Sequence, residues 1–562
     1  MSSSTASSQR PEEATLSELD VVLLDCQTTN ATPELGDLLE LGWAIHARDG
    51  TMRSAHSTWL VPRSTREISR AVRRLTGFDE TCLATAITPE DAWSRLRKDM
   101  AGVPHVGERV PAVIHFARFE LTFLRDLQQR IEGEAPFPID AVCLHRIAQR
   151  LYPNLPRRGL RALAGYLGHS AELARRCAGH VEATAFIWRT VVPALAEIGV
   201  RTFGDLKTWL EETSPSRSSR GQKRVFPMPI AARRALPDGP GVYRFVRSNG
   251  DVLYVGKAVS VKKRVASHFS GAARASNERT LEMLTQAADV TVVPTATVLE
   301  AALLEADEIK RLDPPYNVQL RERDRRAWFA SADLRTAVSV PDATHRIGPL
   351  PSSHALSEIA AVRALAEGAT PTTELLASAM GVPVSFAPPA ALFAEIFSEF
   401  ARAHLKKGSP WLALQRASKK IRVVARDEEQ DGPPSGWDRE RVRRWLDRAV
   451  VRGVHLVRRA RWLCILSDAV IAFREPDATS FRLLSCDGAV LAPARDFSGD
   501  APLPAPPAKR TAHARRLVFD AARYDRLRVL ATELRRVHDE GGEVRIRVGE
   551  HVILQQKLRH VL

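Results

Sequence analysis

A segment rich in serine, proline and basic residues divides the chain. Residues 211–229 read EETSPSRSSRGQKRVFPMP and contain little that a hydrophobic core could bury. Such a composition is typical of an interdomain linker. The chain has 562 residues, which is too long for one core. The sequence therefore predicts several domains, with a basic linker at 201–235 as one boundary.

The charge balance favours a polyanionic partner. Lys and Arg number 81 against 66 Asp and Glu, which gives a net charge of +15. Each contact with a phosphate releases counterions, so a basic surface binds nucleic acid readily, although charge alone fits DNA, RNA or an acidic protein equally. In the linker, Arg217, Arg220, Lys223 and Arg224 could contact such a backbone or could simply be solvated.

The chain carries none of the signals of a secreted or membrane protein. No apolar run reaches the roughly 20 residues that a membrane span needs, and residues 1–18 are polar and acidic. We expect residues 1–18 to be disordered and the protein to be cytoplasmic, without a membrane partner. The six cysteines form no CxxC pair, which predicts reduced thiols rather than a zinc site or disulfides.

Residues 19–200 alternate between strand-like and helix-like runs. Apolar strands are expected at 21–26 (VVLLDC), 38–47 (LLELGWAIHA) and 111–116 (PAVIHF), and helical periodicity follows at 120–131, 160–168 and 180–198. Strands with interleaved helices predict an α/β layer fold.

Polar residues at the ends of these runs resemble the motifs of the DEDDh (DnaQ-like) exonucleases, which have an RNase H-like fold. That family uses four carboxylates to hold two metal ions and a histidine to activate water. Asp25 fits the first motif, but Gln27 stands in place of its glutamate. In the second motif Phe116 replaces an asparagine and Glu120 an aspartate.

The third motif departs further. Arg175 stands where the family has its histidine and His180 where it has its aspartate. Neither Gln27 nor Arg175 supplies negative charge, and an arginine repels a metal ion. The resemblance thus implies a degenerate exonuclease domain, kept for architecture or DNA binding, with a rebuilt site at His180 and Glu182 as the alternative.

Residues 236–326 form a compact segment with a second set of polar landmarks. The runs GVYRFV and VLYVGKA predict a hairpin, and LEAALLEADEIKRL predicts a helix with Leu299, Ala302, Leu303 and Ile309 facing a core. Gly241 and Gly256 are expected to allow close backbone approach or unusual torsions. The polar landmarks are Tyr243, Tyr254, Lys257, Arg264, His268, Glu305 and Asn317.

This pattern resembles the GIY-YIG nuclease domain of the UvrC and Cho excision-repair type. The resemblance implies that Glu305 holds one divalent ion, Mg²⁺ or Mn²⁺, and that Tyr243, with Tyr254 beside it, activates or orients water. A tyrosine acting as base would need its pKa, about 10, lowered by cations. Lys257 and Arg264 would bind phosphate oxygens.

The resemblance also assigns roles to two further residues. His268 would either share in proton transfer or pack as an aromatic ring, and Asn317 would brace the site by hydrogen bonding. The plain alternative for Glu305 is a solvated carboxylate on a helix face, as we expect for Glu300 and Glu308.

The remainder of the chain is less informative. We expect a helical extension at 327–390 and a mixed α+β region of unknown role at 391–562, which makes the whole chain an α/β multidomain protein. Between Arg439 and Trp462 many arginines and several tryptophans alternate. This run predicts either a DNA-binding helix with stacking aromatics or an amphipathic helix with tryptophan inside.

Together these features predict a metal-dependent DNA endonuclease that makes a single-strand incision in nucleotide excision repair. Its partners would be damaged duplex DNA and damage-recognition proteins of the UvrA and UvrB type. Two alternatives remain open at this point. One is a 3′–5′ exonuclease acting through the first domain, and the other is a non-catalytic DNA-binding scaffold.

Overall fold

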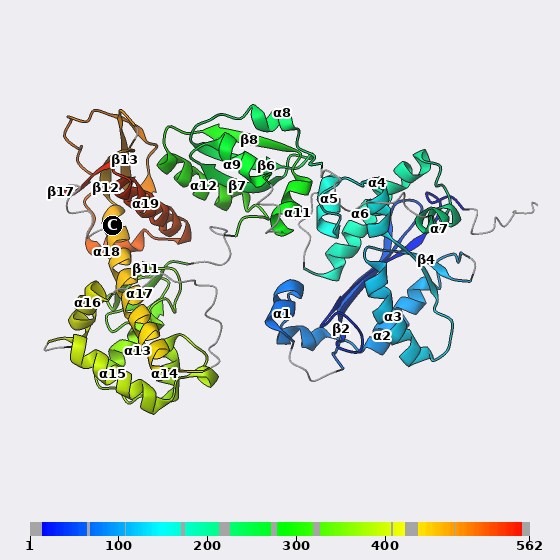
Figure 1. The fold of residues 1–562 in the computed structure, drawn as a ribbon, viewed down its shortest axis with the longest axis horizontal. Coiled ribbons are helices and arrows are strands. Elements are labelled where there is room, and N and C mark those ends of the chain that lie inside the picture. The colour runs from blue at the N-terminus through cyan, green and yellow to red at the C-terminus, as the bar shows by residue number, and fades with distance from the viewer. Residues whose placement is uncertain are drawn as a thin grey trace, which may run out of the picture.

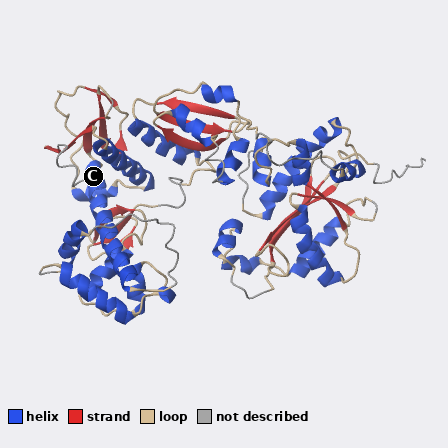
Figure 2. Ribbon diagram, viewed as in Figure 1, coloured by secondary structure: helices blue, strands red, loops and turns tan. Residues whose placement is uncertain are grey.

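The computed structural model describes residues 14–553 except 64–67, 107, 170–174, 213–224, 271–277, 319–325, 406–407, 422–435 and 477. Most of the serine-rich linker, with Arg217, Arg220, Lys223 and Arg224, therefore lies outside the described residues, as do residues 1–13. In the described part of the chain, four sheets with their covering helices succeed one another from the N-terminus to the C-terminus (Figures 1 and 2).

The first unit is built on a five-stranded sheet of order β3-β2-β1-β4-β5. Strands β1 (Val21–Thr28), β2 (Leu38–His46) and β3 (Met52–Trp59) pair antiparallel, whereas β4 (Val110–Ile114) and β5 (Ile139–Cys143) continue the sheet in parallel with β1. This mixed sheet confirms the predicted α/β, RNase H-like fold class.

Helices cover both faces of that sheet. Val21 and Leu23 of β1 pack with α4 (Leu144–Leu151), α5 (Leu160–Tyr166) and α6 (Cys177–Glu197). The alternate residues of β1, Val22 and Leu24, pack with α2 (Pro89–Met100) and α3 (Ala117–Glu132). Because both faces are covered, β1 reads as a continuous apolar run rather than as an alternating one.

Two short helices complete the first unit. Helix α1 (Arg70–Thr76) follows β3, and α7 (Phe203–Glu211) follows α6. Residues 14–18 were expected to be disordered, but Leu16 is buried and donates its backbone N–H to the Arg201 carbonyl at 2.7 Å. Burial of this apolar side chain stabilises an ordered conformation of the segment despite its polar composition.

The nuclease-like unit is a three-stranded antiparallel sheet of order β7-β6-β8. Its strands are β6 (Gly241–Val246), β7 (Val252–Ala258) and β8 (Asp289–Pro294). The helices are α8 (Ile230–Arg234), α9 (Val261–His268), α11 (Glu278–Gln286) and α12 (Val298–Leu312). Helices α7 and α8 thus occupy the two ends of the range predicted as linker.

The next segment differs from the predicted helical extension because it opens with a small sheet. Strands β9 (Trp328–Ser331), β10 (Ala337–Val338) and β11 (His345–Leu350) pair antiparallel. The helices that follow are α13 (Ser357–Ala366), α14 (Thr373–Met380), α15 (Ala390–His404), α16 (Pro410–Lys420) and α17 (Arg439–Leu466). These strands are short and lack clear alternation, so local periodicity did not reveal them.

The run of arginine and tryptophan forms α17, a 28-residue helix packed through the centre of the helical segment. Its Val442, Leu446 and Val450 are fully buried, and Trp462 is buried as well. The structure thus shows an amphipathic helix with Trp462 inside, whereas Trp445 of the same helix is half-buried.

The C-terminal unit, residues 468–553, is a sheet flanked by two helices. Its strands are β12 (Ala469–Arg474), β13 (Phe481–Asp487), β14 (Val490–Leu491), β15 (Arg495–Phe497), β16 (Glu543–Val548) and β17 (His551–Ile553). The helices are α18 (Ala512–Leu517) and α19 (Ala521–Asp539). The core of this unit also includes Leu299 and Leu303 of α12, so it is continuous with the nuclease-like unit.

Among the described helices, none combines the length and the apolar character that a membrane span requires.

We predict that Gly453→Ala destabilises the C-terminal half of the chain. A Cβ at Gly453 in α17 would lie 2.3 Å from the Ile359 Cβ of α13, and that branched side chain is itself buried. Overpacking of this kind costs about 1–3 kcal/mol, more than the roughly 1 kcal/mol that alanine gains over glycine in a helix. Calorimetry should show a lower melting temperature, while Arg452→Ala at the exposed neighbouring position should leave it unchanged.

Candidate active site

The two tyrosines of the nuclease-like unit meet across the β6–β7 hairpin. In the register of this pair, Tyr243 lies opposite Gly256 and Phe245 opposite Tyr254. A Cβ on Gly256 would stand 2.6 Å from the Tyr243 hydroxyl oxygen and 2.7 Å from Tyr254 Cε1. The φ of Gly256 is not in the left-handed region, so the glycine is needed for close approach and not for an unusual torsion.

His268, at the end of α9, contacts the Tyr243 hydroxyl. The distance from Tyr243 Oη to His268 Nε2 is 2.8 Å. Burial, with the charge of Arg264, lowers the pKa of His268 to about 4, so the ring is neutral near pH 7. In a neutral ring one nitrogen carries a proton and the other accepts, so the tautomer of His268 sets which of the two residues donates in this hydrogen bond. The ring also packs against Phe245 and Tyr254, so His268 combines a polar contact with aromatic packing.

The electrostatics of the tyrosines differ from what a general base requires. Burial raises the pKa of Tyr243 and that of Tyr254, and the nearby charge of Arg264 offsets this only in part. Since His268 has a low pKa, transfer of the phenolic proton to it is strongly uphill. The surrounding protein therefore favours a protonated Tyr243 that orients a partner rather than one that removes a proton.

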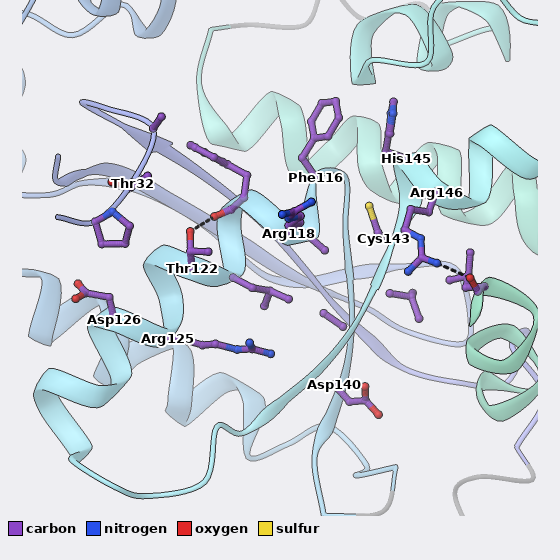
Figure 3. Close-up of a pocket in the computed structure, with 18 of the residues that line it drawn as sticks. Thr32, Phe116, Arg118, Thr122, Arg125, Asp126, Asp140, Cys143, His145 and Arg146 are labelled. Carbon is purple, nitrogen blue, oxygen red and sulfur yellow. Dashed lines mark hydrogen bonds between the residues drawn. The ribbon is translucent and has the colours of Figure 1, made fainter. Parts of the chain in front are cut away.

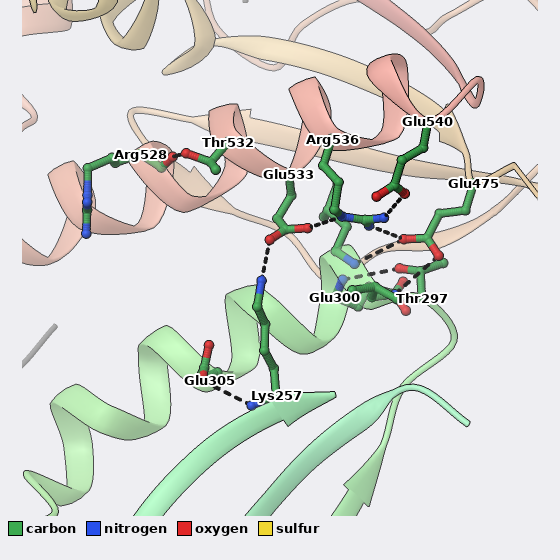
Figure 4. A network of polar contacts seen from close by, with 12 residues as sticks. Lys257, Thr297, Glu300, Glu305, Glu475, Arg528, Thr532, Glu533, Arg536 and Glu540 are labelled. Carbon is green, nitrogen blue, oxygen red and sulfur yellow. Dashed lines mark hydrogen bonds and ion pairs between the residues drawn. The ribbon is translucent and has the colours of Figure 1, made fainter. Parts of the chain in front are cut away.

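Glu305 projects from the middle of α12 toward the end of β7. Its Oε1 accepts the backbone N–H of Lys257 at 3.0 Å (Figure 4). The pKa of Glu305 is raised, first by burial and further by the charge of Glu533, while the Lys257 N–H and ammonium act in the opposite direction. Because burial is the largest cause of this shift, a bound cation would offset the cost of keeping the half-buried Glu305 carboxylate charged.

The neighbouring carboxylates of α12 are not solvated as the sequence led us to expect. Glu308 is buried and accepts from Arg244 Nε at 2.6 Å. Glu300 accepts from Arg482 of the C-terminal unit at 2.9 and 2.7 Å. The expectation was wrong because α12 is covered on two sides, which a helix-face argument based on one segment cannot reveal.

The remaining landmarks frame a cavity at the end of β7. Lys257 and Arg264 line it with Ala258, Val259, Ser260, Lys263 and Val298, and its volume is about 520 Å³. Beneath it, the buried Asn317 side chain accepts the Val255 backbone N–H and donates to the Val255 carbonyl, both at 2.9 Å. Asn317 thereby holds β7 in place. Within the described ranges, no three His, Cys, Asp or Glu side chains gather as a metal cluster.

The exonuclease-like positions of the first unit also come together, but as neutralised pairs. His180 Nδ1 lies 3.0 Å from Asp25 Oδ2. Burial lowers the pKa of His180, yet the hydrogen bond and charge of Asp25 outweigh it and leave the pKa raised. The pKa of the buried Glu120 is raised, first by burial and then by the charge of Asp25, which favours the protonated form of this carboxyl. The Gln27 side-chain amide donates to the backbone carbonyl of Arg175, and the Arg175 side chain is exposed.

A large cavity of about 1500 Å³ lies beside these positions, between α3, the start of α4 and α7 (Figure 3). Phe116 and His145 project at its edge, with ring centroids 4.6 Å apart. Its charged lining is balanced, because four cations face four carboxylates: Arg118, Arg125, Arg146 and Lys207 against Glu34, Asp126, Asp140 and Glu211. A phosphate-binding groove is expected to carry net positive charge, which this cavity does not.

The middle of the chain matches a known domain. Residues 239–318 match the family model of the UvrC-like GIY-YIG domain. The UvrABC system protein C of Rhizobium meliloti (strain 1021) is 51% identical over 114 residues, which are 20% of this chain and 16% of that protein. The resemblance of this segment to the UvrC type of nuclease domain is thus confirmed.

Two further similarities extend the comparison. A protein of Mycobacterium tuberculosis (strain CDC 1551 / Oshkosh), named as a bifunctional exonuclease/endonuclease protein, is 28% identical over 386 residues, 66% of this chain and 56% of that protein. The magnesium-bound structure of the GIY-YIG N-terminal endonuclease domain of UvrC from Thermotoga maritima is 30% identical, with a TM-score of 0.14, over 16% of this chain and 93% of that chain. The match thus spans about half the length of the Mycobacterium tuberculosis protein and far less of the Rhizobium meliloti protein.

One residue beside the site could not have been found from the sequence. Glu533 of α19 pairs with the ammonium of Lys257, although 276 residues separate the two in the chain. No motif surrounds Glu533. Its position in an arginine-rich helix predicts only a solvated carboxylate that pairs with neighbouring arginines.

The Asp25–His180 pair makes stability depend on pH in a defined direction. The folded-state pKa of His180 is raised above 6.5, so its contribution is fully present below about pH 6.5 and is lost as the pH rises through the folded value. We predict that His180→Asn lowers the free energy of unfolding most at pH 5–6, and that the deficit shrinks toward pH 9. Urea unfolding at several pH values measures this, with His105→Asn at an exposed position as control. A deficit that is constant over this range would contradict the pairing.

Proposed function

We propose that this protein is a metal-dependent DNA endonuclease whose reaction takes place in the nuclease-like unit. The observation that carries the proposal is the convergence of Glu305, the Tyr243–His268 pair and the Lys257 and Arg264 side chains around the end of β7. The match of residues 239–318 to the UvrC-like GIY-YIG domain supports the same reaction class. Phosphodiester hydrolysis needs these three kinds of group: a metal ligand, a group that places water, and cations for the phosphate.

Glu305 is the residue that would hold one Mg²⁺ or Mn²⁺. Its surroundings fit such an ion, because burial and the charge of Glu533 raise its pKa and a bound cation would relieve that cost. When bound, the ion supplies Lewis-acid stabilisation of charge on the phosphoryl and leaving oxygens. The Thermotoga maritima domain, bound to magnesium, supports this choice of metal.

The other side chains have roles that follow from their contacts. Tyr243, fixed by His268, presents a phenol oxygen that orients the attacking water, with Tyr254 closing the same wall. Lys257 and Arg264 meet the phosphate from the cavity, the first as a point charge and the second through its planar fork. Asn317 keeps β7, and with it Lys257, in position.

The substrate that fits best is duplex DNA carrying a lesion, nicked on one strand in nucleotide excision repair. The relatives named as UvrABC system protein C support this assignment, as does the basic charge of the chain. Damage-recognition proteins of the UvrA and UvrB type would deliver the substrate in the cytoplasm. In this proposal the first unit has a structural role, because His180 is hydrogen-bonded to the Asp25 carboxylate that a metal ion would need as a ligand.

We predict that Glu305→Gln abolishes nicking. The substitution keeps the size of the side chain but removes the charge that binds the metal, and loss of such electrostatic stabilisation lowers the rate by at least about a hundredfold. The measurement is the appearance of internal nicks in end-labelled duplex DNA, with and without a bulky lesion and UvrA- and UvrB-type proteins, in Mg²⁺ or Mn²⁺. An unchanged melting temperature would show that the variant is folded.

Asp25→Asn is the matched control, because it removes a carboxylate from the other candidate site. It should nick as the unaltered protein does. Shortening from 3′ ends that is lost in Asp25→Asn and kept in Glu305→Gln would instead place the reaction in the first unit. Tight DNA binding without any metal-dependent cleavage would favour a non-catalytic scaffold.

A further inference from the structure

Helix α12, which carries Glu305, is buried between two units. Ala301, Ala306 and Ile309 pack toward Val242 and Val255 of the nuclease sheet. On another side, Leu299 and Leu303 belong to the core that contains α19 and β12 of the C-terminal unit. The helix that presents the metal ligand is therefore shared between the nuclease-like unit and the C-terminal unit.

Ion pairs and hydrogen bonds fasten α12 to the C-terminal unit along its length. At its start, the Glu475 carboxylate accepts the backbone N–H groups of Val298 and Leu299 at 3.4 and 3.2 Å. At its end, Lys310 donates to Asp525 at 2.8 Å. A carboxylate at the first turn and a cation at the last turn both agree with the helix dipole.

Within this interface, Glu533 reaches the candidate active site itself. Its Oε1 pairs with the Lys257 ammonium, and its Oε2 accepts from Arg536 Nε at 2.7 Å (Figure 4). Arg536 is in turn held by Glu475 at 2.9 Å and by Glu540 at 2.6 Å. The Glu533 side chain is only 6% exposed, so this carboxylate has a fixed place from which to hold Lys257.

The contact fixes Lys257 without covering it. The Lys257 side chain is still 34% exposed and lines the cavity with Ser260 and Arg264. An ammonium has three N–H donors, so two remain for a phosphate after the one given to Glu533. A carboxylate that blocked the site would instead bury the ammonium.

The contact between Glu533 and Lys257 also keeps the phosphate-binding ammonium apart from the metal ligand. The Lys257 backbone N–H binds Glu305, and its ammonium attracts the same carboxylate. If Glu533 were absent, Glu305 would be an available partner for the ammonium. Such a pair would occupy both the metal ligand and the phosphate-binding group.

We propose that Glu533, supplied by the C-terminal unit, is a positioning residue of the nuclease site that holds the Lys257 ammonium at the cavity and away from Glu305. The inference rests on the proposed function for its effect on rate. The C-terminal unit then has a defined role. It supplies one residue of the nuclease site, whose other residues belong to the GIY-YIG domain.

The first test is kinetic. Glu533→Gln keeps the shape but removes the charge, and kcat for nicking should fall at least about tenfold with KM little changed, because a misplaced group costs most in the transition state. Glu533→Asp keeps the charge and should recover part of the rate. Glu540→Gln, which removes a carboxylate from the same Arg536 network without a contact to Lys257, should nick as the unaltered protein does. Equal or faster nicking by Glu533→Gln would overturn the proposal.

The second test needs neither metal nor DNA. An amine-acylating reagent followed by mass spectrometry measures the labelling of Lys257 relative to the exposed Lys263 of the same cavity. In Glu533→Gln the ammonium should move to Glu305, so labelling of Lys257 should rise several-fold only when Glu305→Gln is added to Glu533→Gln, and it should stay unchanged in Glu540→Gln. Equal labelling of Lys257 in Glu533→Gln and in the double variant Glu533→Gln, Glu305→Gln would overturn the proposal. If the unaltered protein never nicks DNA, the proposed function fails, and this labelling still decides whether Glu533 holds Lys257.

Discussion

The burial of α12 between the nuclease sheet and the C-terminal unit is the interaction on which the candidate site depends. One side of the helix packs on β6 and β7, and another contributes Leu299 and Leu303 to the core below β12 and α19. A helix held from two sides has little freedom to rotate or shift. Glu305 on that helix therefore keeps a fixed relation to Lys257 on β7 and to the tyrosine pair behind it.

Burial of that helix brings charged groups out of water, and pairing compensates for the cost. Glu308 with Arg244, Lys310 with Asp525 and Glu533 with Lys257 each match a carboxylate with a cation. A buried pair is costly to break because one partner is left uncompensated. The Glu305 carboxyl is the contrasting case: it accepts one backbone N–H, and its pKa is raised by burial. This contrast is what distinguishes a group prepared for a metal ion from groups that only join two units.

The first unit shows how a similar arrangement of acids can be neutralised. Its fold brings Glu120 of α3 and His180 of α6 close to Asp25 of β1, the central strand of the sheet. The raised pKa of His180 favours an imidazolium beside Asp25, and the raised pKa of Glu120 favours a neutral carboxyl. Both shifts act to reduce the negative charge beside Asp25 without a metal ion, and this is the physical ground for proposing a structural role for the first unit.

The sequence by itself determined the local features: the β6–β7 hairpin and a helix with Glu305 in its middle. These follow from strand alternation, turn residues and helical period, which act over a few residues. The sequence did not reveal that Glu300 and Glu308 are paired, that the segment after residue 327 begins with a sheet, or that Glu533 lies beside Lys257. Only the tertiary structure decided these, because a contact between residues 276 positions apart depends on how two cores pack against one helix, and no local pattern encodes that packing.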